Sequence, residues 1–269
     1  MPVLALLFAV AALQPSTSQP EAKEPVKAPD SKPATQPETK PDAKPDAKAG
    51  APVRTASGKS LTVPSNHATL GTIYHTLVSD AKQVTFSSVV KDPLGKEVKF
   101  DGHSSSVVGY AVAGPTDNPA ALKAGAWLLA VKTLDTGNKL RDKHIAAEDW
   151  LGAAKNPDIT FVLKEVKDIK PHKESPSGKS YLGTLVGTMT VRGTSKELSI
   201  PDATLGFIKG SDSTAKIGKG DLLALRCKYK VKLSDFGVTN EQIGKGVADE
   251  IEIDQTLMLS NVPPEEQGK

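Results

Sequence analysis

The chain has 269 residues, of which 34 are Lys or Arg and 31 are Asp or Glu, so its net charge at neutral pH is only +3. This balance excludes the strongly basic surface that a general nucleic-acid-binding protein needs, and we expect no nucleic-acid partner. The single cysteine, Cys227, excludes an intrachain disulfide, so the folded part must be stabilised by its core.

Residues 1–14 predict a secretory signal peptide. The stretch from Met1 to Leu13 is uncharged and mostly apolar, and it is too short to span a bilayer, which takes about 20 residues. Ala9-Val10-Ala11 has the small-residue pattern of a cleavage site. An uncleaved short anchor is the alternative. We therefore expect an exported protein that resides in the periplasm or another extracytoplasmic compartment.

Residues 15–60 predict an extended, solvated spacer. Prolines recur at positions 25, 29, 33, 37, 41 and 45, and Lys and Asp or Glu alternate between them. Such a segment has too little apolar surface to offset the entropy lost on folding. Pro-rich segments also bind aromatic grooves, which is the less favoured interpretation here. Residues 61–79 follow as a lead-in segment.

The remainder of the chain alternates between apolar and polar residues with a period of two, which is typical of half-buried strands of an antiparallel sheet. The clearest strand runs over 222–234, where every odd position from Leu223 to Leu233 is apolar or Cys. Other strands are predicted around 84–86, 97–112, 127–131, 159–166, 181–191, 198–207 and 247–259. If 97–112 is one strand bent at Gly102, the count is eight. The fold class is therefore all-β, an eight-stranded antiparallel barrel over 80–261, followed by a tail over 262–269.

One helix is predicted within this series, over 138–151. Asn138 is a suitable N-cap, and Leu140, His144, Ala147 and Leu151 share a face at helical spacing. Gly152 would end the helix. We expect this helix to cover one end of the barrel.

Four sequence blocks resemble the YceI-like family. The first is Leu134-Asp-Thr-Gly-Asn-Lys-Leu-Arg-Asp-Lys-His-Ile145, with the pattern Asp-Thr-Gly, a gap and Arg-Asp-x-His. The others are 156–161, 187–196, and 233–238 followed by 247–251, in the same order and spacing. The resemblance implies a lipocalin-like barrel, usually exported, that binds a polyisoprenoid or isoprenoid quinone. The chain departs from the family where a His-Ser pair is common, since 79–86 has no such pair.

The predicted ligand-binding lumen is lined by inward-facing residues of these strands: Phe86, Trp127, Leu129, Phe161, Tyr181, Leu185, Met189, Leu225, Cys227, Tyr229, Val231, Ile251, Ile253 and Leu257. A long-chain amphiphilic lipid is the expected partner, with transient membrane contact and a monomeric or homodimeric state both left open. No cofactor other than bound lipid is expected. The alternative is a barrel filled by its own side chains, acting as a structural or partner-binding module.

Arg141, Asp142 and His144 form the most conspicuous polar group, with two interpretations. Arg141 could hold a head-group oxygen or phosphate of the lipid. Alternatively, Arg141 and Asp142 anchor the helix to the barrel rim while His144 packs beneath it, which we favour. Enzyme motifs are weak, because no G-x-S-x-G elbow occurs and the histidines are scattered. We therefore expect a non-enzymatic protein, without a catalytic or metal site, in which Cys227 is inert.

Overall fold

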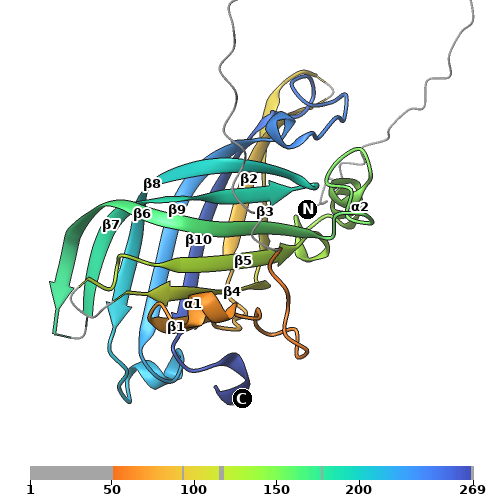
Figure 1. The fold of residues 1–269 in the computed structure, drawn as a ribbon. Helices are drawn as coiled ribbons and strands as arrows, with labels where there is room; N and C mark the ends of the chain where they lie inside the picture. Colours follow the sequence, from red (N-terminus) through yellow and green to blue (C-terminus); the bar gives the residue numbers. More distant parts are fainter. Residues whose placement is uncertain (1–50, 93, 115–117, 177, 268–269) are drawn as a thin grey trace, which may run out of the picture. The chain divides into compact units, whose positions relative to one another are not determined.

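The computed structural model describes residues 51–92, 94–114, 118–176 and 178–267 (Figure 1). These residues belong to one unit that spans Ala49–Lys269. The predicted signal peptide, and the predicted spacer up to residue 50, lie outside the described residues. No helix in the described part is long and apolar enough to cross a membrane.

Strands make up most of the regular structure in the described ranges. They are β1 (Thr72–Thr76), β2 (Val84–Lys91), β3 (Glu97–Ser104), β4 (Val107–Ala113), β5 (Ala124–Ala130), β6 (Asp158–Ser175), β7 (Gly178–Val191), β8 (Thr194–Ile208), β9 (Leu222–Lys232) and β10 (Glu250–Ser260). The α-helices are α1 (Ser65–Ala68) and α2 (Lys139–Ala146), and short 3-10 turns cover Val131–Thr133, Thr214–Lys216, Ser234–Phe236 and Pro264–Glu266.

Eight of the described strands close into an antiparallel barrel, which confirms the predicted fold class. The order round the ring is β1-β4-β5-β6-β7-β8-β9-β10, and β1 pairs with β10 to complete it. The closing seam is short, with His75 opposite Ser260 and Thr76 opposite Leu259. By contrast, β9 and β10 pair continuously from Lys232 opposite Glu250 to Leu222 opposite Ser260.

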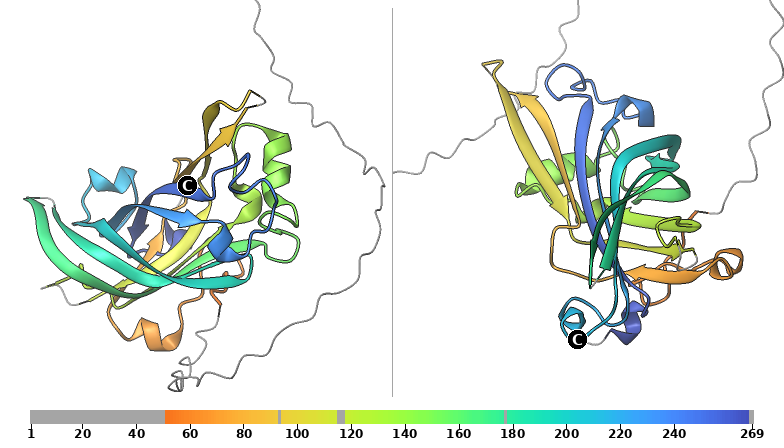
Figure 2. Two further views of the ribbon diagram at one scale, coloured as in Figure 1. Left: turned by 90° about the horizontal axis from the view of Figure 1, so that it is seen from above. Right: turned by 90° about the vertical axis from the view of Figure 1, so that its left-hand side faces the viewer.

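The prediction of one bent strand over 97–112 is wrong. Strand β3 ends at Ser104 and pairs with β2, whereas β4 begins at Val107 and pairs with β1 and β5. Gly102 does not bend the chain; it lies opposite Phe86 and leaves room for its ring. The β2–β3 hairpin is joined to the sheet through the pairing of β2 with β10, and it projects beyond the barrel body (Figure 2). The eighth strand of the ring is instead β1, from the predicted lead-in segment.

Local bulges decide which residues of the long strands face inward. Strand β6 shifts register between Leu163 and Glu165 and again between Lys167 and Lys170. In β8, Asp202 adopts a φ of 54° beside a similar shift. A bulge adds one residue to a strand and so exchanges the two faces beyond it. Odd-position alternation therefore holds throughout β9 and β10 but not along β6 or β8.

Residues 51–63, here named the N-terminal strap, cover the outer face of β4 and β5. Leu61 is 1% exposed and joins a cluster of outward-facing residues that includes Val108, Tyr110 and Val112. Arg54 forms an isolated bridge with Leu61. Residues 51–60 of the predicted spacer therefore belong to the folded unit.

The predicted helix begins where expected but is shorter. Asn138 Oδ1 accepts hydrogen bonds from the backbone N–H groups of Leu140 and Arg141, at 3.0 and 3.2 Å, so its N-cap role is confirmed. Helix α2 ends at Ala146, because Ala147 turns to extended backbone with ψ of 162°. The predicted common face is wrong, since Leu140 is 58% exposed and His144 is exposed, while Leu151 is buried.

Candidate ligand-binding lumen

The inward faces of the barrel strands form one continuous apolar cluster. All fourteen residues predicted to line the lumen belong to it, either fully buried or packed against its buried members. In β9 and β10 these residues lie opposite one another, with Leu225 paired with Leu257, Tyr229 with Ile253, and Val231 with Ile251. The structure therefore brings the predicted lining together, and its role in binding a ligand stays a prediction.

Aromatic rings of this cluster lie against glycines of the barrel wall. A β-carbon placed at Gly102 would be 2.2 Å from Phe86 Cζ, and one at Gly109 would be 2.3 Å from Trp127 Cδ1. At Gly187 it would be 2.5 Å from Phe161 Cζ. A glycine in a strand allows such a close approach because it has no side chain. The rings therefore cover the wall instead of projecting straight across the barrel.

Tyr229 and Cys227 show how protected the inner face of β9 is. Burial raises the pKa of the Tyr229 hydroxyl, yet part of the residue's surface stays accessible. Burial also raises the pKa of the Cys227 thiol to about 12, so the reactive thiolate is not formed at neutral pH. Cys227 is 4% exposed and packs as a small apolar residue of the inner cluster.

Hydrogen bonds within the Asp-Thr-Gly…Arg-Asp segment hold it in one conformation. The Asp142 carboxylate accepts from the backbone N–H and the hydroxyl of Thr136, at 2.9 and 2.7 Å. Although desolvation acts to raise the pKa of Asp142, these bonds lower it overall. Arg141 Nη2 donates to Thr136 O at 2.9 Å, and its guanidinium carbon lies 4.7 Å from the Phe100 ring centroid.

Arg141 joins α2 both to Thr136 in the loop before it and to Phe100 of β3. Asp142, by contrast, bonds within the loop and the helix. The anchoring role favoured for these two residues stays a prediction. His144 does not have the position expected for it. Its side chain is exposed and does not pack beneath the helix. The adjacent residues Ile145 and Ala146 pack against the inner cluster instead.

The end of the barrel beside α2 is closed by several segments together. Trp150, Leu151, Phe236, Val238 and Ile243 all belong to the inner cluster or pack against it. Arg192, at the β7–β8 turn, donates to the backbone oxygens of Glu148 and Gly237 and so ties two of these segments to the barrel. The predicted helix covers this end as part of a larger plug.

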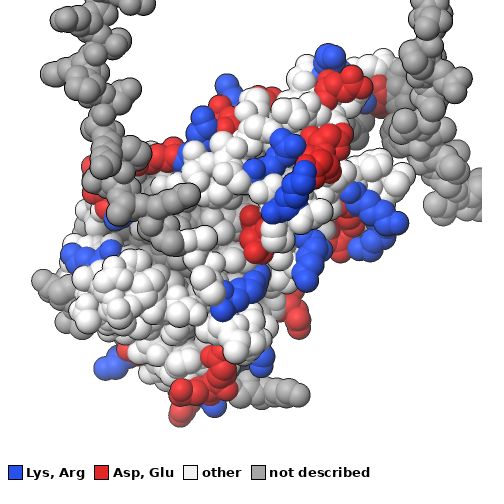
Figure 3. All heavy atoms as spheres, turned by 45° about the vertical axis from the view of Figure 1, so that its right-hand side comes forward, with Lys and Arg blue, Asp and Glu red and all other residues white. Residues whose placement is uncertain are grey.

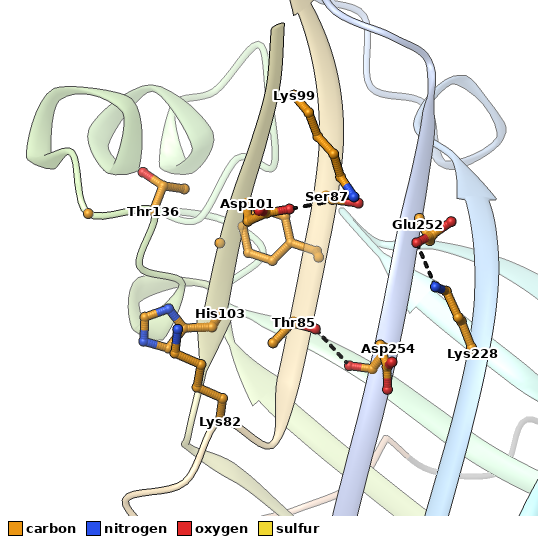
Figure 4. Close-up of a pocket in the computed structure, with 13 residues that line it drawn as sticks. Lys82, Thr85, Ser87, Lys99, Asp101, His103, Thr136, Lys228, Glu252 and Asp254 are labelled. Carbon is orange, nitrogen blue, oxygen red and sulfur yellow. Dashed lines mark hydrogen bonds and ion pairs between the residues drawn. The ribbon is translucent and has the colours of Figure 1, made fainter.

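A cleft of about 520 Å³, lined mostly by polar residues, lies on the outer side of β2, β3, β9 and β10 (Figure 4). Its lining comes from the segment before β2, from β2, β3, β9 and β10, and from the loop before α2: Lys82, Thr85, Phe86, Ser87, Lys99, Asp101, Gly102, His103, Thr136, Gly137, Lys228, Glu252 and Asp254. Lys228 pairs with Glu252 at 2.9 Å, and Thr85 donates to Asp254 O at 3.4 Å. No local pattern in the sequence indicates this cleft, because residues of segments that are distant in the chain line it together.

Charges of both signs alternate on the outer surface. Across β9 and β10, Lys230 pairs with Glu250 at 2.7 Å and Arg226 with Asp254 at 3.8 Å. Figure 3 shows blue and red side chains interleaved on the face that it presents. Across the described ranges, no three His, Cys, Asp or Glu side chains come together in a way that could hold a metal ion.

Comparison with known proteins assigns the barrel to a family. The model of the YceI-like domain matches residues 75–259. The chain belongs to the YceI-like family. The match begins within β1 and ends within β10, the two strands whose pairing closes the ring. It thus covers the ring and the β2–β3 hairpin.

Individual relatives of this YceI-like chain are distant. UPF0312 proteins of Yersinia enterocolitica and Yersinia pestis are 28% identical over 124 residues, which cover 46% of this chain and 56% of the relative. The chain thus spans little more than half the length of these relatives. A crystal structure of the Campylobacter jejuni YceI protein is 25% identical, covers 58% of this chain and 82% of that chain, and has a TM-score of 0.43. A polyisoprenoid-binding domain from Saccharophagus degradans is 11% identical, with a TM-score of 0.46, and covers 70% of this chain and 98% of that chain.

Proposed function

We propose that this chain binds a long-chain isoprenoid-type lipid within the barrel, as a non-enzymatic carrier or store. The inner cluster carries this proposal, because it is continuous, apolar and built on aromatic rings that lie against wall glycines. Membership of the YceI-like family supports a barrel of this kind. The related domain from Saccharophagus degradans is described as polyisoprenoid-binding, which gives the ligand class to test first.

Burial of an isoprenoid chain would supply most of the affinity. Each methylene transferred from water into the apolar interior contributes about 0.8 kcal/mol. A few isoprene units would therefore offset the loss of freedom on binding without a polar contact along the tail. Tyr229 on the inner face of β9 is only partly buried, so it has surface that a bound lipid would cover.

Mass spectrometry of an organic extract from the full chain, purified without detergent, tests the proposal. A long-chain lipid in stoichiometric amount is the expected result. A lipid-free preparation should take up a long-chain quinone or polyprenol from vesicles. An empty extract together with no uptake would contradict lipid binding and would favour the filled-barrel module.

Export is the second part of the proposal. The apolar start of the chain and the Pro-, Lys- and Asp-rich spacer support a protein that works in the periplasm or outside the cell. Cell fractionation with N-terminal sequencing of the mature protein checks this. A cytoplasmic protein that retains Met1 to Leu13 would contradict it.

A further inference from the structure

Two polar groups without partners lie beside the Phe100 ring of β3, next to α2. Ser88 is 3% exposed, and its hydroxyl has no hydrogen-bond partner among the described residues. The Nε of Arg141 is likewise buried and unpartnered within the described ranges. An unsatisfied buried donor costs free energy, so such groups call for a physical explanation.

The geometry of β2 and β3 places both groups on the face of the β2–β3 hairpin that carries Val84 and Phe86. Val84 and Phe86 face the inner cluster, and Ser88 follows them at the same parity. Ser88 lies directly opposite Phe100, and side chains at opposite positions have β-carbons about 4.5–5.5 Å apart. The Arg141 guanidinium stacks on that same Phe100 ring. Ser88 and Arg141 therefore flank one aromatic side chain.

Arg141 also has no counter-charge in the part of the chain that the structure describes. The adjacent carboxylate of Asp142 is taken up by Thr136 and by Lys139, whose Nζ lies 3.4 Å away. Arg141 uses one Nη to hold Thr136 O and keeps further donors free for another acceptor. A half-buried guanidinium without a carboxylate favours a strong acceptor oxygen, whether anionic or neutral.

We propose that Ser88 and Arg141 bind an acceptor oxygen of the lipid's head group, a step that rests on the function proposed above. The head group would then lie beside α2, and the tail would run along the inner cluster towards Tyr181, near the β6–β7 turn. His75 Nδ1, Thr76 Oγ1 and Trp127 Nε1 are also buried and unpartnered among the described residues. His75 and Thr76 are consecutive in β1, so their side chains point to opposite faces of that strand. The acceptor would be a phosphate oxygen or a neutral carbonyl or hydroxyl oxygen.

Binding of farnesyl phosphate, farnesol and farnesene to the full chain tests this proposal, because these probes share a carbon skeleton and differ in the head. Fluorescence of Trp127 and Trp150, which border the inner cluster, reports binding. We expect S88A to weaken farnesol and farnesyl phosphate binding about five- to tenfold, the value of one hydrogen bond, and to leave farnesene unchanged. S87A is the matched control, because Ser87 lines the outer cleft on the opposite face of β2.

The two proposals fail in different ways. If none of the probes binds the parent chain, lipid binding itself is contradicted. If all three bind but S88A leaves their relative affinities unchanged, lipid binding stands and the head-group site is overturned. Thermal unfolding of S88A should be unchanged or slightly improved, because the substitution removes an unsatisfied hydroxyl.

The R141Q variant distinguishes a phosphate acceptor oxygen from a neutral carbonyl or hydroxyl oxygen. A greater loss for farnesyl phosphate than for farnesol supports an anionic phosphate head, and an equal loss supports a neutral carbonyl or hydroxyl. No loss for either would contradict the part given to Arg141. Because Arg141 also holds Thr136 O, circular dichroism and thermal unfolding must show that R141Q retains the parent fold.

Discussion

Strands β4 and β5 separate two apolar clusters that differ in how they are covered. On the outer face, Val108, Tyr110, Val112, Ala126 and Leu128 are all at most 8% exposed, because the N-terminal strap packs over this face. Ile73 of the paired strand β1 borders the same cluster. On the inner face, Trp127 and Leu129 join a larger cluster, in which Phe86, Phe161, Tyr181 and Tyr229 are only partly buried. Both faces of β4 and β5 are themselves buried, so the difference between the clusters lies in the other strands, which contribute the partly buried inner residues.

Under the proposed function, the outer cluster serves the fold alone and the inner cluster also binds the ligand. The strap is also fixed by polar contacts. The Ser57 hydroxyl donates to Glu265 Oε1 at 2.6 Å, and Arg54 Nη2 lies 3.9 Å from Asp158 Oδ1. Near it, His67 Nδ1 and the Tyr110 hydroxyl are hydrogen-bonded at 2.8 Å. Outer substitutions should therefore change stability alone, and inner ones should change ligand binding as well.

A charge in the inner cluster should have the largest effect. Leu225 is 2% exposed and lies between Leu205 and Leu257 in register, so L225R would bury an unpaired guanidinium. We expect loss of more than about 4 kcal/mol of stability, or no folded protein at all. I253R should behave similarly. A224R, on the opposite face of β9, should fold and bind lipid; if L225R did so too, the assignment of the faces would be wrong.

Truncation of the Leu61 side chain in the strap should cause the next largest loss of stability. Leu61 is 1% exposed against the outer cluster, and L61A should lower the free energy of unfolding by about 2–4 kcal/mol. Lipid uptake by the protein that remains folded should be unchanged. L70A is the matched control, since Leu70 is 44% exposed and its truncation should cost little. Chemical denaturation measures both, and a lower lipid affinity of L61A would break the proposed separation of roles.

Replacing a glycine of the barrel wall by alanine should lower stability and also change the environment of an inner aromatic ring. In G109A, the new β-carbon would be 2.3 Å from Trp127 Cδ1 and 2.5 Å from Ala126 O. We expect about 1–3 kcal/mol of destabilisation and a shift of Trp127 fluorescence, because the ring must leave the wall. In G206A the nearest atom would be at 3.6 Å, so this control should be tolerated. Equal effects of the two substitutions would contradict the role given to the rings.

Acidification should slightly lower the stability of the folded state through His75 of β1. Burial lowers the pKa of His75, and Glu265 only partly counteracts this shift. Because the folded pKa lies below the ordinary value of 6.5, the folded state favours neutral His75, and its stability should fall as the pH drops below 6.5. H75Q should flatten this part of a stability profile measured by denaturation. A decline below pH 4.5 should remain in H75Q, because the Ser57 hydrogen bond lowers the pKa of Glu265.

The alternation of apolar and polar residues was enough to predict the inward faces of β5, β7, β9 and β10. There the pairing is regular enough for local pattern to fix the direction of each side chain. It did not reveal β1, whose five residues carry little pattern of their own and become a strand by pairing with β4 and β10. Nor did it show that α2 ends at Ala146, since the turn after it is fixed by contacts with Arg192 and the inner cluster.

The sequence by itself determined the all-β class, the position of the helix start and the inner faces of β5, β7, β9 and β10, because period-two alternation and capping are local properties. Only the tertiary structure decided that β3 leaves the ring, that the strap seals the outer face, and that Ser88 and Arg141 lie beside the same ring. These features depend on which distant segments pair and pack, and no local pattern in the chain specifies such partners.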